Sequence, residues 1–112
     1  TGTGVMPLGV IKTVAELSSL SVLAPEVVWS LATGNNARVW DLPAGEIAVG
    51  KPADLVVMDA PWGSLARDAL GALARGDIPG ISAVITAGEV RVGRSRNTPA
   101  AARMTTVRRG GI

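Results

Sequence analysis

The sequence contains no cysteine and no histidine, and each absence excludes a class of site. Without cysteine there is no disulfide, no thiolate nucleophile and no cysteine metal ligand. Histidine is the commonest protein ligand of catalytic zinc and the usual general base near neutral pH. A complete hydrolytic zinc site is therefore not expected within these 112 residues.

Long apolar runs are also missing. No stretch approaches the ~18 residues that a membrane-spanning helix needs, and the N-terminus does not resemble a signal peptide. We therefore expect a cytoplasmic location and no membrane partner. Hydrophobic residues make up 47% of the chain and charged residues 18%, a composition typical of a folded domain.

Aromatic residues are scarce, because three tryptophans are the only ones. Trp29, Trp40 and Trp62 have apolar neighbours, whereas a surface that stacks nucleic-acid bases would surround them with basic residues. We predict that they pack in a core or an interface. The C-terminal residues are rich in arginine, but the net charge is only +2 and no nucleic-acid motif is present. A solvated tail, or an arginine paired at a subunit contact, is the favoured interpretation, and no nucleic-acid partner is expected.

The first forty residues have helical periodicity. One helix is predicted over about 7–20, and a second begins at Pro25 and Glu26, which suit a first helical turn. Gly34 is predicted to end this second helix. Asn35 or Asn36 is predicted to cap a third short helix that reaches Trp40.

From residue 46 the period changes to that of strands. Ile47 and Val49 alternate with other residues, and the apolar run 55–58 predicts a buried strand. Helical spacing returns over 64–75, and residues 77–80 carry proline and glycine in a turn pattern. The stretches 82–86 and 89–92 flank Ala87 and Gly88, which predicts a hairpin.

Two adjacent motifs carry a family resemblance. Residues 45–57, GEIAVGKPADLVV, closely resemble the G-x-I-x-x-G-x-x-A-D-L-V-V segment of the amidohydrolase superfamily. Residues 32–42, ATGNNARVWDL, are similar to the A-T-x-N-x-A-x-x-x-x-L helix that precedes it in that family. The segments 2–9, 76–82 and 95–99 look most like enamidases, which hydrolyse cyclic amides.

The resemblance implies an α/β plus β fold, in which the last helices of a TIM-type (β/α) barrel lead into the C-terminal part of a small β-sandwich. Residues 1–44 would form the terminal barrel loop and helices. Residues 45–94 would form the sandwich portion, with an inserted helix near 64–75, and residues 95–112 a basic, partly ordered tail. Because the chain begins at Thr1 rather than at methionine, we expect a truncated reading frame or a cut product.

The resemblance also implies a chemistry that this chain does not contain. In the family, zinc or iron activates a water molecule and polarises the amide, and the ligands are barrel histidines, often a carboxylated lysine, and an aspartate that ends the eighth strand. None of these matches a residue here, so no catalytic or metal-binding residue is predicted and the chain alone is expected to be inactive.

One loop is the candidate site. By the resemblance, Gly2, Thr3 and Gly4 follow the eighth barrel strand, where the loops face the substrate. The glycines would allow close approach of the backbone and Thr3 would offer a hydroxyl. Alternatively, these glycines only form the strand-to-helix turn.

The implied partners are a cyclic amide, a missing N-terminal barrel portion, and further copies of the intact enzyme in a homo-oligomer. Two alternatives stay open at this point. Instead of an enamidase fragment, the chain could be a free-standing accessory or binding module. It could also be part of a related deacetylase or other cyclic-amide hydrolase.

Overall fold

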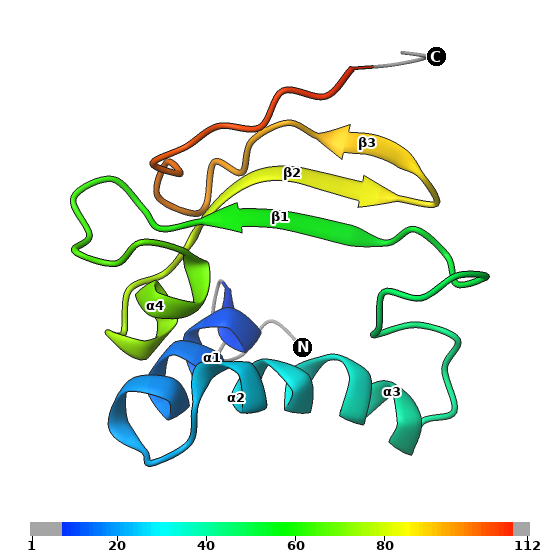
Figure 1. Ribbon diagram of the computed structural model, residues 1–112, viewed down its shortest axis with the longest axis horizontal. Helices are drawn as coiled ribbons and strands as arrows, with labels where there is room; N and C mark the ends of the chain where they lie inside the picture. The colour runs from blue at the N-terminus through cyan, green and yellow to red at the C-terminus, as the bar shows by residue number, and fades with distance from the viewer. Residues whose placement is uncertain (1–7, 109–112) are drawn as a thin grey trace, which may run out of the picture.

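The computed structural model describes residues 8–108 and contains a helical layer beside an antiparallel sheet (Figure 1). Helices α1 to α3 form one side, the sheet forms the other, and α4 lies between them at one end. In chain order the elements are α1 (Gly9–Leu20), α2 (Pro25–Ala32), α3 (Gly34–Val39), β1 (Leu55–Asp59), α4 (Ala69–Ala74), β2 (Gly80–Thr86) and β3 (Glu89–Val92).

The core lies where three helices meet. α4 packs against both α1 and α2. The buried cluster there consists of Val14 and Ala15 from α1, Val28 from α2 and Leu73 from α4. Apolar residues repeat every three or four positions on α1 and α2, so each helix turns one apolar stripe toward this cluster. The predicted helices over about 7–20 and from Pro25 are confirmed, with α1 beginning at Gly9.

The boundary between α2 and α3 differs from the prediction. Thr33 has φ −119° and ψ −95°, so the break falls at this residue rather than at Gly34, which begins α3. Asn35 and Asn36 lie inside α3, and no side chain caps it. A tertiary contact explains the position of the glycine, because a Cβ at Gly34 would lie 3.2 Å from the carbonyl oxygen of Gly45.

The sheet has the order β1-β2-β3, and both pairs are antiparallel. The predicted hairpin between β2 and β3 is confirmed. Ala87 and Gly88 have φ values of 50° and 79°, the positive angles of a type I′ turn. Alanine is a poor residue for the first position of this turn, where φ is positive. Asp54 stabilises the turn, because its Oδ1 accepts a hydrogen bond of 2.8 Å from the Ala87 amide.

Three other predictions in this half of the chain were wrong, and the helix predicted over 64–75 is confirmed only in part. Ile47 and Val49 form no strand and are 89% and 107% exposed. β1 is an edge strand, and Val56 within it is 48% exposed, so the strand is not buried. The helix predicted over 64–75 is confined to Ala69–Ala74. Asp68 caps its N-terminus, because its Oδ1 accepts a hydrogen bond of 2.8 Å from the Gly71 amide. Residues 77–79 make no turn.

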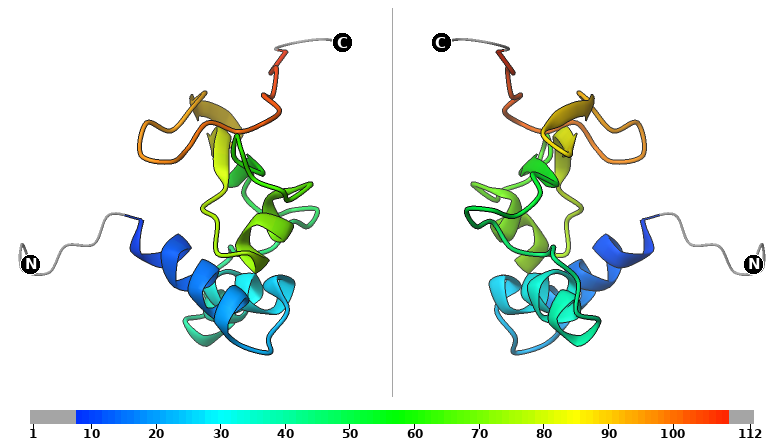
Figure 2. Two further views of the ribbon diagram at one scale, coloured as in Figure 1. Left: turned by 90° about the vertical axis from the view of Figure 1, so that its left-hand side faces the viewer. Right: turned by 90° about the vertical axis from the view of Figure 1, so that its right-hand side faces the viewer.

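The residues after β3 run beside the sheet, and residues 94–108 are called the C-terminal segment below (Figures 1 and 2). Pro61 and Ala101 form an isolated antiparallel bridge. Flanking it, the Trp62 amide donates to the Ala100 carbonyl at 3.0 Å, and the Ala102 amide donates to the Ala60 carbonyl at 2.8 Å. Ala101 is 1% exposed, so this part of the basic tail is anchored.

Candidate functional site

The predicted substrate-adjacent residues Gly2, Thr3 and Gly4 lie outside the described residues. Within residues 8–108, no group of three or more His, Cys, Asp or Glu side chains is placed to hold a metal ion. No helix in that part of the chain is long and apolar enough to cross a membrane.

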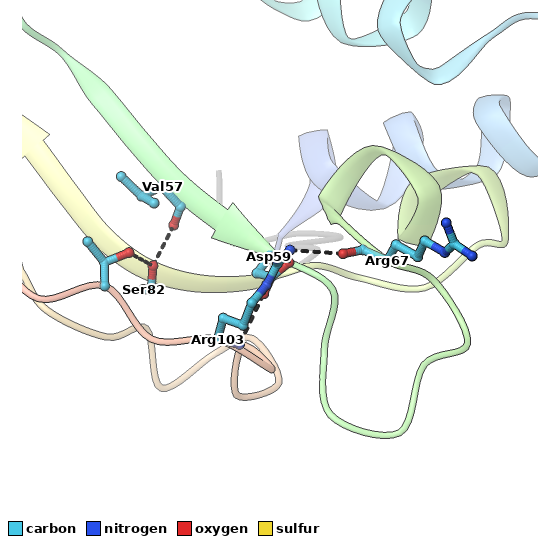
Figure 3. Close-up of polar contacts among 6 residues, drawn as sticks. Val57, Asp59, Arg67, Ser82 and Arg103 are labelled. Atoms are coloured by element: carbon cyan, nitrogen blue, oxygen red, sulfur yellow. Dashed lines mark hydrogen bonds and ion pairs between the residues drawn. The ribbon is translucent and has the colours of Figure 1, made fainter.

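The strongest polar cluster joins β1 to the C-terminal segment (Figure 3). Asp59 ends β1 and is 6% exposed. The Arg103 guanidinium binds both carboxylate oxygens, with Nε 2.7 Å from Oδ2 and Nη2 2.8 Å from Oδ1. The Arg103 amide also donates to Oδ2, at 3.0 Å. Nη2 donates a second hydrogen bond, of 2.9 Å, to the Arg67 carbonyl. The Arg103 side chain therefore links the C-terminal segment to the end of β1 and to the loop that precedes α4.

The electrostatics of this pair indicate a structural role. The hydrogen bond from the Arg103 side chain is the main cause that lowers the pKa of Asp59, to about 2, although burial acts in the opposite direction. The same contact raises the pKa of Arg103. A carboxylate with so low a pKa and three donors is a poor general base. It neutralises and positions the arginine instead.

Because of this contact, acid should weaken the anchoring of the C-terminal segment. The folded pKa of Asp59, about 2, lies below its ordinary value of 3.8, so the ionised form stabilises the fold. That stabilisation is complete above about pH 4 and is lost as the pH falls through about 2. Protection of the Arg103 amide against hydrogen exchange, corrected for intrinsic rates, is expected to fall across this window. The variant Asp59→Asn should show lower protection with little dependence on pH, and the same acid profile in both proteins would contradict the assignment.

A pair of hydroxyls makes a second link to the same segment. Ser82 in β2 is 2% exposed, and its Oγ lies 2.7 Å from Thr105 Oγ1. The Ser82 hydroxyl also lies 3.3 Å from the carbonyl oxygen of Val57, to which it donates. A serine nucleophile requires a base beside it, but among residues 8–108 the Ser82 hydroxyl bonds only to a backbone carbonyl and another hydroxyl. Ser82 is therefore a structural residue.

Sequence reasoning missed the pairing of Arg103. The tail arginines were predicted to be solvated or to pair at a subunit contact, whereas Arg103 pairs within the chain. The partners are 44 residues apart, and no local spacing relates them. The only available signal was an aspartate directly after a predicted strand.

An apolar groove lies between two helices of the helical layer. This groove of about 460 Å³ between α1 and α2 is lined almost entirely by apolar side chains. Val10 is 68% exposed and Leu31 49% exposed along it. Surfaces of this kind usually mark contacts with other protein.

Of the tryptophans, Trp29 packs against the core as predicted, but Trp40 and Trp62 are 70% and 74% exposed within this chain.

Comparison with known proteins gives one consistent match, although no family model matches the chain. Enamidase from Eubacterium barkeri is 53% identical over 102 residues, which are 91% of this chain and 26% of that protein. A crystal structure of enamidase, described as a new member of the amidohydrolase superfamily, matches with a TM-score of 0.89 and 52% identity over 93% of this chain. The match covers 27% of that structure, so the chain spans about a quarter of the length of these proteins.

The resemblance carried by residues 32–57 is therefore confirmed. The fold is a small mixed α/β piece of an amidohydrolase structure, with its helices on one side and a three-stranded antiparallel sheet on the other. Over the residues that it spans, this chain matches one part of enamidase, a member of the amidohydrolase superfamily.

Proposed function

We propose that this chain forms the C-terminal part of a metal-dependent, enamidase-like hydrolase that opens a cyclic amide. The observation that carries the proposal is the 53% identity to enamidase over 91% of the chain. In this proposal α1 and α2 are the last helices of a (β/α) barrel, and β1, β2 and β3 belong to the adjoining β-sandwich. A cytoplasmic location and assembly of the intact enzyme into a homo-oligomer are parts of the same proposal.

The residues of this chain do not fit a metal site. The sequence lacks histidine, and residues 8–108 hold no cluster of three acidic ligands. Zinc or iron held by the rest of the enzyme would supply an activated water at neutral pH and polarise the amide carbonyl. Gly2, Thr3 and Gly4 lie outside the described residues; in this proposal they belong to a loop that would border the substrate.

The apolar groove between α1 and α2 supports the proposal that this chain packs against a separate barrel portion that holds the metal. Helices that cover a barrel need an apolar face toward the barrel as well as their own core. Val10 and Leu31 line the groove without belonging to the core cluster, whose members Val14 and Val28 also line it. Burial of side chains of this size contributes about 1.5–3 kcal/mol each, which favours assembly with a barrel portion.

The test is reconstitution of activity. The chain is combined with the part of E. barkeri enamidase that it does not match, and this mixture is called the assembled protein below. With zinc or iron added, the assembled protein is expected to hydrolyse a cyclic amide, whereas each portion alone should be inactive. Leu31→Asp in the groove should prevent assembly, while Val22→Asp, at a fully exposed position outside it, should not.

A metal-loaded assembled protein that hydrolyses no cyclic amide would contradict the proposed activity. Activity on acetylated amines instead would favour a related deacetylase.

The second candidate, a free-standing accessory or binding module, makes a different prediction for the chain alone. A piece with an uncovered apolar groove should associate and melt without cooperativity. Size-exclusion chromatography and circular dichroism of the isolated chain measure both properties. A monomer with a cooperative thermal transition would favour the module and count against the hydrolase part.

A further inference from the structure

The loop between β1 and α4 projects beyond the end of the sheet (Figure 1). It contains Trp62, one of the exposed large hydrophobic residues. The Ser64 amide donates to the Pro61 carbonyl at 3.1 Å, and Gly63 has a φ of 84°, so residues 61–64 form a tight turn. The Trp62 amide is bound to the Ala100 carbonyl, 3.0 Å away. Trp62 is thus held by its backbone while its side chain is 74% exposed.

The turn borders a hollow of about 390 Å³ that contains one carboxylate. Asp77 lines the hollow together with Trp62, and the Ser64 hydroxyl donates to Asp77 Oδ2 at 2.6 Å. The Ala66 amide in turn donates to the Ser64 oxygen, 3.1 Å away, which fixes the hydroxyl. Pro61 and Pro99 add apolar walls, and no basic side chain lines the hollow.

Asp77 lines the hollow and keeps one carboxylate oxygen without a hydrogen-bond donor among residues 8–108. The three ion pairs formed among residues 8–108 do not include it. Its Oδ2 accepts from Ser64, and Oδ1 accepts no hydrogen bond from that part of the chain. A half-buried carboxylate and an exposed indole that line the same hollow favour a flat cation, because a guanidinium can stack on an indole and donate N–H groups to a carboxylate.

We propose that this hollow, between Trp62 and Asp77, is a binding site for a guanidinium group. The planar cation stacks on the Trp62 indole and donates to Asp77 Oδ1, while Ser64 keeps the carboxylate in place. A compact ammonium would make the charge contact without the stacking, and an anion would face the Asp77 charge with no cation to balance it. The guanidinium belongs either to a small organic cation or to an arginine of a second copy of this chain. The site is independent of the proposed amide hydrolysis.

The test is a titration of the assembled protein, or of the isolated chain if it melts cooperatively. 5-Fluorotryptophan is incorporated into this chain alone, and the Trp62 resonance is assigned in the ¹⁹F spectrum with Trp62→Phe. Ethylguanidinium chloride is expected to shift this resonance in a saturable manner, whereas sodium chloride at equal ionic strength should not. Asp77→Asn, which keeps an acceptor for Ser64, should weaken binding about fivefold, as expected for loss of an exposed ion pair.

The matched control is Asp41→Asn, which removes an exposed carboxylate outside the hollow and should leave binding unchanged. A Trp62 shift that depends on protein concentration without added ligand, and that Asp77→Asn abolishes, would identify an arginine of a second copy as the occupant. A linear shift, or equal binding by Asp77→Asn, would overturn the proposal. Because the readout is spectroscopic, this failure is distinguishable from loss of amide hydrolysis.

Discussion

Replacing Gly80 with alanine is expected to release the C-terminal segment from the sheet. Gly80 begins β2 and lies directly against the backbone of the segment. A Cβ at this position would lie 2.5 Å from Ala101 Cα and 2.7 Å from the carbonyl carbon of Ala100. These atoms are backbone and cannot turn aside as a flexible side chain could. Overpacking of this kind typically costs about 1–3 kcal/mol, and we expect the upper end of that range.

Limited trypsin digestion of the assembled protein measures this release. Cleavage after Arg103 is expected to be slow in the folded protein, because trypsin must take the Arg103 side chain away from Asp59, which its guanidinium and amide both bind. A loss of about 3 kcal/mol should raise the rate of cleavage there roughly a hundredfold, if cleavage follows local opening. Gly93→Ala is the matched control, because nothing lies within 4 Å of a Cβ at that position. Equal protection in Gly80→Ala and Gly93→Ala would contradict the close packing seen here.

Leu73→Ala should produce the second large effect, a loss of about 2–5 kcal/mol in the free energy of unfolding. Leu73 is 0% exposed and packs with Val14, Ala15 and Val28 at the meeting point of three helices. Truncation removes apolar contacts and leaves a cavity that the surrounding helices fill only in part. The expected order of stability is wild type, then Leu73→Met, then Leu73→Ala, because methionine conserves most of the volume.

Urea unfolding of the assembled protein, followed by the fluorescence of Trp29, measures this loss. Trp29 packs against the same cluster and reports its disruption. The control Leu65→Ala removes a leucine that is 83% exposed and should change the unfolding free energy by less than about 0.5 kcal/mol. Similar losses for Leu65→Ala and Leu73→Ala would mean that Leu73 is not a core residue of the folded protein.

Local chemistry was enough to predict several elements. Pro25 and Glu26 favour a first helical turn wherever they occur, and α2 begins there. Glycine at the second position of a two-residue hairpin favours positive φ, and β2 and β3 turn at Gly88. The start of α2 and the turn between β2 and β3 therefore depend only on residues that are close together in the sequence.

Long-range contacts decided what local patterns could not. Gly80 was assigned to a turn, yet its role is to let the backbone of Ala101 approach. The alternation of Ile47 and Val49 predicts a strand, but a strand needs a hydrogen-bonded neighbour, and this structure provides none for these residues.

The sequence by itself determined the superfamily resemblance, the main helices, the hairpin and the exclusion of a histidine metal site, because each depends on composition or short-range spacing. Only the tertiary structure decided that Arg103 closes on Asp59, that the C-terminal segment is anchored, and that Trp62 and Asp77 border one hollow. Those contacts join residues brought together by folding, and their free energy comes from burial and charge neutralisation that no local pattern encodes.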